Sequence, residues 1–205
     1  MILWAEFLAI FVAVPLLFYF RVLPNAPIPA LIAFAAGASV YLHRKGYRLA
    51  DFLAWPGWPA LVPMLLRAAL LCLIIGLFVW RVMPDKLFEF PRRAPAFWAM
   101  VMLLYPLLSV LPQEILFRAF FFERYRPIFA NDMSMALASA LAFGFVHIIF
   151  GNWISVGLSA VGGVLFAITY LQTGSLLAAC IEHAIFGDFI FTIGLGEYFF
   201  HGSRR

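Results

Sequence analysis

Seven apolar runs, each close to the length that crosses a lipid bilayer, constrain this chain more than any other feature of its sequence. Backbone polar groups inside hydrocarbon must find hydrogen-bond partners within the protein, so spanning runs fold as helices unless strands close into a barrel. The long alternating segments of a barrel are absent from the sequence. The sequence therefore predicts an all-α fold, a polytopic transmembrane helix bundle with about seven spans, at residues 2–20, 27–42, 60–80, 97–121, 133–150, 154–171 and 175–194.

Composition and charge exclude several classes of protein. Of 205 residues, 65% are hydrophobic and only 12% are charged, far from the roughly half and quarter typical of soluble domains. Soluble enzymes, disordered chains and disulfide scaffolds are excluded. The net charge of +4 comes from basic residues spread over short loops, where lipid headgroups account for them. We therefore expect a lipid bilayer as partner and no nucleic acid. Basic residues fall on both sides of the bundle and leave its orientation open.

The predicted organisation is one membrane domain in two parts. Residues 1–95 hold the N-terminal transmembrane helices and an interfacial segment rich in tryptophan and proline, and residues 96–200 hold the helices that carry the chemistry. Residues 201–205 are expected to be a tail, and an artificial extension is one explanation for it. The turns at 151–153 and 172–174 are so short that the last three helices must be antiparallel neighbours. A longer polar loop is expected from Glu123 to Asp132.

Ionisable residues inside the predicted spans are few and clustered in the second half of the chain. Charged groups in hydrocarbon cost several kcal/mol, so they are functional candidates by default. Glu114 and Arg118, four residues apart, share one helix face, and an internal ion pair is their structural interpretation. His147 and His183 lie on two further helices. One carboxylate and two histidines can position and deprotonate a water, and they also match the ligand set of a catalytic zinc.

Four other ionisable residues receive weaker interpretations. Glu6 and Arg67 are close enough to helix ends for their charges to snorkel to the interface. Glu182 points about 100° away from His183 around the helix, so we expect it to cap the helix or face a loop. Asp188 reaches the same site as His183 only where Gly187 loosens the helix.

Three short motifs resemble those of one known family. The run from Gln113 to Arg118 is similar to the EExxxR motif of the CPBP intramembrane proteases, also called the ABI or CAAX-protease family, which includes the Rce1-type prenyl-protein endopeptidases. The run from Phe143 to His147 matches the FxxxH motif of that family. The segment from His183 resembles its third motif, HxxxN or HxxxD, with Gly187 at the last position and Asp188 as a displaced candidate.

The resemblance implies roles for individual residues and exposes one conflict. The first Glu of the first motif and the His of the second are thought to activate water, and the third motif is thought to stabilise the oxyanion. These roles fall on position 113, His147 and His183, while Arg118 would orient and charge-balance the acidic pair. Position 113 is Gln113, and an amide cannot act as a general base. The chain is then a Glu-to-Gln variant of an enzyme, an enzyme in which Glu114 is the base, or a natural pseudoenzyme; the first is favoured.

Function, cofactor and partner expectations follow from these motifs. The leading hypothesis is an intramembrane endopeptidase, inactive in this form, that acts on a peptide or protein substrate in the membrane, in a bacterial inner membrane. Prenylated C-termini, bacteriocin leaders and C-terminal sorting tails are all compatible substrates. The cofactor is none or a divalent metal such as zinc, with Glu114, His147 and His183 as candidate ligands. The alternatives are a catalytically dead scaffold or immunity-type protein, and a rhomboid-like serine protease using Ser159 and His183.

Overall fold

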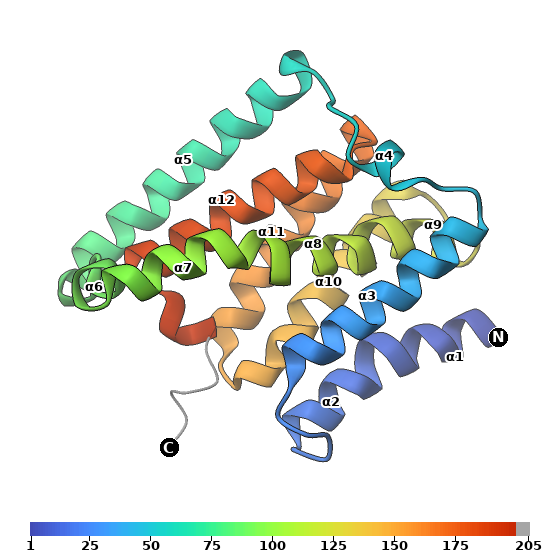
Figure 1. Cartoon of the computed structure of the whole chain (residues 1–205), viewed down its shortest axis with the longest axis horizontal. Coiled ribbons are helices and arrows are strands. Elements are labelled where there is room, and N and C mark those ends of the chain that lie inside the picture. The colour runs from blue at the N-terminus through green and yellow to red at the C-terminus, as the bar shows by residue number, and fades with distance from the viewer. Residues whose placement is uncertain (200–205) are drawn as a thin grey trace.

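The computed structural model describes residues 1–199, apart from the side chains of residues 49 and 51. Within that range every regular element is helical and no strand is present (Figure 1). The expected all-α bundle is confirmed. Residue 200 and the predicted tail at 201–205 lie outside the described residues.

Six helices of residues 1–199 are long and apolar enough to cross a membrane. They match six of the predicted runs closely, except that the fourth continues seven residues further. They are Ile2–Tyr19 (α1, Ile2–Leu8, and α2, Val14–Tyr19), Trp58–Val82 (α5), Pro95–Ile128 (α7, Pro95–Tyr105; α8, Leu111–Glu114; α9, Phe121–Tyr125), Asp132–Phe150 (α10, Asp132–Val146, and a 3-10 turn), Trp153–Thr173 (α11) and Leu176–Ile193 (α12).

The remaining predicted run forms α3, Pro27–Arg44, which packs against the long helix Pro95–Ile128. It is less apolar than the other six because it begins with two prolines and ends with His43 and Arg44. The predicted count of seven spans is therefore approximate. Two short helices, α4 (Leu49–Phe52) and α6 (Glu89–Arg93), lie in the connections before and after α5.

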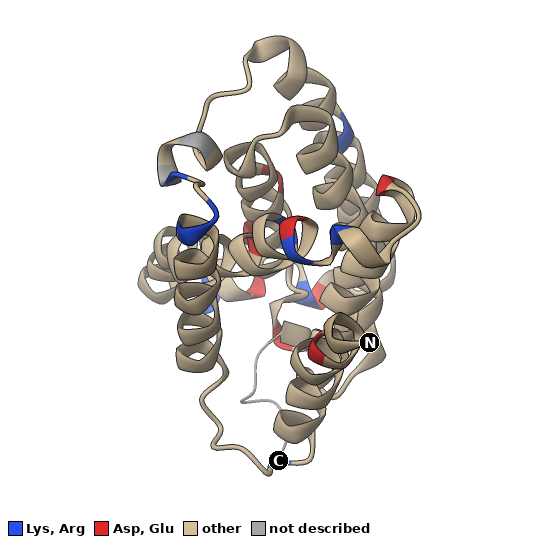
Figure 2. Ribbon diagram, turned by 90° about the vertical axis from the view of Figure 1, so that its right-hand side faces the viewer, with Lys and Arg blue, Asp and Glu red and all other residues tan. Residues whose placement is uncertain are grey.

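The outer surface of the bundle is apolar, as a lipid-facing surface must be. Leu66, Leu70, Leu73 and Leu77 recur along α5 at helical spacing, and all four side chains are exposed. Charged residues are sparse on the helices, so most of the ribbon in Figure 2 is tan. Exposed apolar faces of this extent are unfavourable in water and favourable against acyl chains. The chain is an integral membrane protein.

Capped, tight turns join the last three spanning helices. The side chain of Asn152 accepts a hydrogen bond from the backbone N–H of Ser155 at the start of α11, and Ser175 caps α12 in the same way. Gly174 ends α11 at φ +63°, a left-handed conformation that glycine adopts without strain. These turns leave too few residues for any arrangement except antiparallel packing, and the predicted neighbour relation is confirmed.

Small residues bring α10 and α11 close together. A Cβ atom added at Gly144 would lie 2.6 Å from the Cβ of Ala160 and 3.0 Å from the carbonyl oxygen of Val156, and one at Gly163 would lie 3.0 Å from the Cα of Ala140. Close backbone approach of this kind is a main source of helix association in membranes. It also fixes the position of His147, which directly follows α10.

Gly144→Ala is therefore expected to destabilise the protein by about 1–3 kcal/mol, the usual cost of overpacking. The matched control is Gly157→Ala on α11, where an added Cβ meets nothing within 4 Å. That control should be neutral or stabilising by up to about 1 kcal/mol, since alanine is the better helix former. Chemical unfolding of both variants in detergent measures the difference. Equal stability of the two variants would contradict close packing at Gly144.

Candidate active site

Glu114 is the buried centre of the polar cluster predicted from the sequence. It ends the short helix α8, which lies between two π-helical segments, Pro106–Val110 and Ile115–Phe120. Its side chain is fully buried. One carboxylate oxygen, Oε1, lies 2.8 Å from His183 Nδ1, and the other, Oε2, lies 3.2 Å from Arg118 Nε. The predicted i, i+4 ion pair is present, and it extends to a histidine 69 residues further along the chain.

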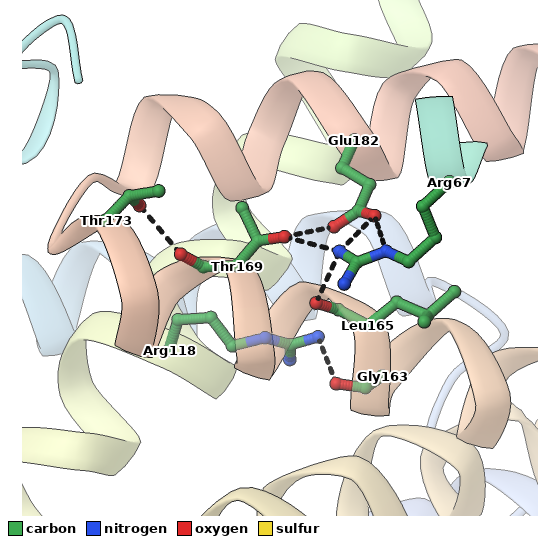
Figure 3. A network of polar contacts seen from close by, with 7 residues as sticks. All are labelled: Arg67, Arg118, Gly163, Leu165, Thr169, Thr173 and Glu182. Atoms are coloured by element: carbon green, nitrogen blue, oxygen red, sulfur yellow. Dashed lines mark hydrogen bonds and ion pairs between the residues drawn. The ribbon is translucent and has the colours of Figure 1, made fainter. Parts of the chain in front are cut away.

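Arg118 is fully buried, and several groups that favour a cation lie beside it, although its Nε and Nη1 have no hydrogen-bond partner among the described residues. Its Nη2 donates to the carbonyl oxygen of Gly163 on α11 at 3.3 Å (Figure 3). Its guanidinium carbon lies 5.0 Å from the ring centre of Phe143 and 5.5 Å from that of Phe166. Ring faces attract a cation, so a carboxylate, a carbonyl and two rings together stabilise the charge.

His183 connects Glu114 to a tyrosine. A carboxylate can only accept, so the Glu114 contact places the proton of a neutral His183 on Nδ1. Its other nitrogen, Nε2, lies 3.1 Å from the hydroxyl of Tyr105. The imidazole stacks on Phe166 with ring centres 4.5 Å apart and planes 13° apart. Both ring nitrogens of His183 are therefore engaged, and its orientation is fixed.

Gln113 and His147 both line open space beside this cluster. Gln113 donates from Nε2 to Ser109 Oγ at 2.6 Å, one helical turn earlier. Nδ1 of His147 lies 2.7 Å from the carbonyl oxygen of Phe143. Because a carbonyl accepts, Nδ1 carries the proton, and Nε2 of a neutral His147 is an acceptor.

Two cavities, of about 320 and 160 Å³, share Gln113 and His147 in their walls. The larger one lies beside the π-helical segment Ala9–Ala13, α2 and α3 and is mostly apolar, with Phe11, Phe18 and Phe34 among its lining residues. The smaller one is also lined by Tyr105, Ser159 and His183. A molecule at Gln113 and His147 would thus have free volume on both sides.

The remaining site predictions have different outcomes. Asp188 is half-buried, its Oδ1 has no hydrogen-bond partner in the described chain, and it lines neither cavity. No group of three His, Cys, Asp or Glu within residues 1–199 could hold a metal ion. The candidate ligands do not fit one, because both oxygens of Glu114 already contact His183 and Arg118.

Ser159 lines the smaller cavity with His183, but no hydrogen bond joins the two among the described residues. A serine nucleophile needs a base within hydrogen-bond reach. His183 has its two nitrogens on Glu114 and Tyr105 instead. This geometry gives the serine-protease alternative no support.

The expectations for Arg67 and Glu182 are wrong. Glu182 neither caps the helix nor faces a loop: it is fully buried and lies 2.6 Å from Arg67 Nη2, and its other oxygen accepts from Thr169 at 2.6 Å. Arg67 does not snorkel, because this pair turns it inward between α5, α11 and α12 (Figure 3). The sequence did contain a signal for this pair: Arg67 and Glu182 carry opposite charges on two different spans, and a charge inside lipid needs a partner. Tyr105 and Ser109 were not singled out from the sequence, because no such signal marks them.

Comparison with known proteins confirms the resemblance seen in the motifs. Residues 95–187 match the family model described as type II CAAX prenyl endopeptidase Rce1-like. The matched segment begins with α7 and ends at Gly187, so it contains Tyr105, Gln113, Glu114, Arg118, His147 and His183. No curated protein and no solved structure matches the chain. This part of the chain is therefore similar to a peptidase family of the CAAX type.

Proposed function

We propose that this chain is an intramembrane endopeptidase of the CAAX type that lacks its proton acceptor, so that it holds a substrate without cleaving it efficiently. Its substrate is a membrane-associated peptide or protein, and its location is a bacterial inner membrane. The observation that carries the proposal is that Gln113 and His147 line the same two cavities, with Nε2 of His147 as an acceptor. The match of residues 95–187 supports the reaction class.

The proposed reaction is the addition of water to a peptide carbonyl. A carboxylate at position 113 together with His147 Nε2 would take the proton from that water, which is general base catalysis. Gln113 can hold a water by hydrogen bonds but cannot accept its proton. Arg118 would hold the carboxylate of Glu114 in place, and that carboxylate would fix the orientation of the His183 imidazole.

Glu114 is a poor replacement for the missing base. Its side chain is fully buried, and it is not among the lining residues of either cavity. Both oxygens already contact His183 and Arg118. Protonating Glu114 would also remove the charge that balances buried Arg118, at a cost of several kcal/mol. We therefore assign Glu114 a positioning role.

Gln113→Glu tests the proposal directly. We expect at least a hundredfold increase in the rate of cleavage, the lower end of the usual contribution of a general base. The measurement uses purified protein in liposomes with a fluorogenic peptide that carries a farnesylated cysteine four residues from its C-terminus. The same peptide without the prenyl group tests whether the larger, apolar cavity binds the prenyl group. The matched control is Gln172→Glu, the same chemical change at an exposed position of α11.

A scaffold is the second candidate function, and Gln113 itself favours it. In that case the Gln113→Glu protein would bind either peptide and cleave neither, while its unfolding transition matched that of the starting protein. Cleavage that appears with Gln113→Glu and not with Gln172→Glu would exclude the scaffold. Cleavage that appears equally with both variants would contradict the role of position 113.

A further inference from the structure

Tyr105 lines the same cavity as Gln113 and His147. It is the last residue of α7, and the π-helical segment that begins with Pro106 follows it directly. Its ring packs edge-on against Phe191 of α12, with ring centres 5.3 Å apart. Its hydroxyl lies 3.1 Å from His183 Nε2, and the residue lines the smaller cavity with Gln113 and His147. Departures from α-helical geometry are common at functional sites.

The direction of the hydrogen bond between Tyr105 and His183 follows from the rest of the chain of contacts. Arg118 lies against Glu114, and Glu114 Oε1 accepts from Nδ1 of His183. A neutral imidazole with its proton on Nδ1 can only accept at Nε2. Tyr105 is therefore the donor, and its hydroxyl proton lies on the hydrogen bond to His183 Nε2. A neutral His183 has no proton at Nε2 to give to a substrate.

Gly187 explains why Tyr105 can occupy this position. A Cβ atom at residue 187 would lie 2.2 Å from Cε1 of Tyr105 and 2.3 Å from its hydroxyl oxygen. No side chain at 187 is compatible with the observed place of the tyrosine. The phenol thus fills the volume that a side chain from this turn of α12 would take.

We infer that Tyr105 is a catalytic residue. Its hydroxyl group donates a hydrogen bond to the negatively charged oxygen that forms when water adds to the substrate carbonyl. This inference rests on the proposed function. In the step, the water oxygen bonds to the carbonyl carbon, the water proton goes to the base at His147 and position 113, and the C=O electron pair moves onto oxygen. Tyr105 keeps its proton and turns its hydrogen bond from His183 Nε2 to that oxygen. Donors aimed at such an oxygen are among the strongest contributors to catalysis.

Tyr105→Phe in the Gln113→Glu protein tests this inference, because phenylalanine keeps the ring and removes only the hydroxyl. We expect kcat to fall by about 10²- to 10³-fold, the usual effect of losing one such donor. KM should stay within about threefold, since the bond strengthens mainly in the transition state. The matched control is Trp98→Phe, which removes a side-chain donor from the same helix: Trp98 Nε1 donates to Thr192 at 3.0 Å, and Trp98 lines neither cavity. The control should keep its kcat.

Gly187→Ala provides a second variant, because the added methyl group displaces the Tyr105 ring. We expect it to lower kcat, and Tyr105→Phe should then add little to the loss. An active Gln113→Glu protein in which Tyr105→Phe changes kcat by less than threefold overturns the role of Tyr105 and leaves the proposed function intact. A Gln113→Glu protein that cleaves neither peptide overturns the proposed function, and the role of Tyr105 with it.

Discussion

Replacing Glu114 with alanine is expected to lower the free energy of unfolding by about 3–5 kcal/mol, the typical cost of breaking a buried ion pair from one side. Arg118 is fully buried, and Glu114 is its carboxylate partner at 3.2 Å. Without Glu114, one carbonyl bond and two aromatic rings would have to stabilise the whole charge. The loss also frees Nδ1 of His183. Chemical unfolding in detergent micelles measures the change.

Two further variants test whether the loss of stability comes from the unpaired buried charge or from a general effect of mutating a glutamate. Glu89→Ala removes the same side chain from an exposed i, i+4 pair with Arg93, and its cost should be no more than about 1 kcal/mol. The double variant Glu114→Met and Arg118→Met removes both charges and should recover most of the lost stability, because apolar pairs often replace buried ion pairs without penalty. A Glu114→Ala protein as stable as Glu89→Ala would show that Arg118 does not depend on Glu114.

Most of the fold could be predicted because hydrocarbon leaves so few choices. Spanning runs had to be helices, and their apolar length placed most ends within about two residues. The prediction of a loop from Glu123 to Asp132 is largely wrong, since the helix continues to Ile128. The polar side chains of this segment suggested a loop, but Glu123 and Arg124 interact with residues of other parts of the chain. Tyr47 donates to Glu123, which raises the pKa of Tyr47, and Arg124 pairs with Glu6 at 2.6 Å.

Glu6 has partners that its position near a helix end did not predict. Its carboxylate accepts from Arg124 at 2.9 and 2.6 Å and from the hydroxyl of Tyr125 at 3.1 Å. The partner lies 118 residues away in sequence, beyond the reach of any local pattern. Helix position follows from apolar length, whereas partner choice follows from how each helix is rotated against its neighbours.

The candidate site shows the same division between local and distant information. The pairing of Glu114 with Arg118 could be predicted, because residues four apart share a helix face. The sequence does not show that His183, rather than His147, bonds to Glu114. It also gave no indication of Tyr105, a single tyrosine inside the apolar run 97–121. Its contact with His183 depends on the empty space at Gly187, which only the packed helices reveal.

His147→Ala in the Gln113→Glu protein is expected to reduce kcat by about 10²- to 10⁴-fold, the range usual for a general base. The Phe143 carbonyl holds Nδ1 of His147, so Nε2 is the atom that can take a proton in the cavities. His43→Ala is the control, since His43 is exposed at the end of α3. In the starting protein, where Gln113 cannot help His147 to take the proton, His147→Ala should change the residual rate far less, because groups that act as one unit are not additive. Equal losses in both proteins would mean that His147 acts independently of position 113 and that the two residues do not share one water.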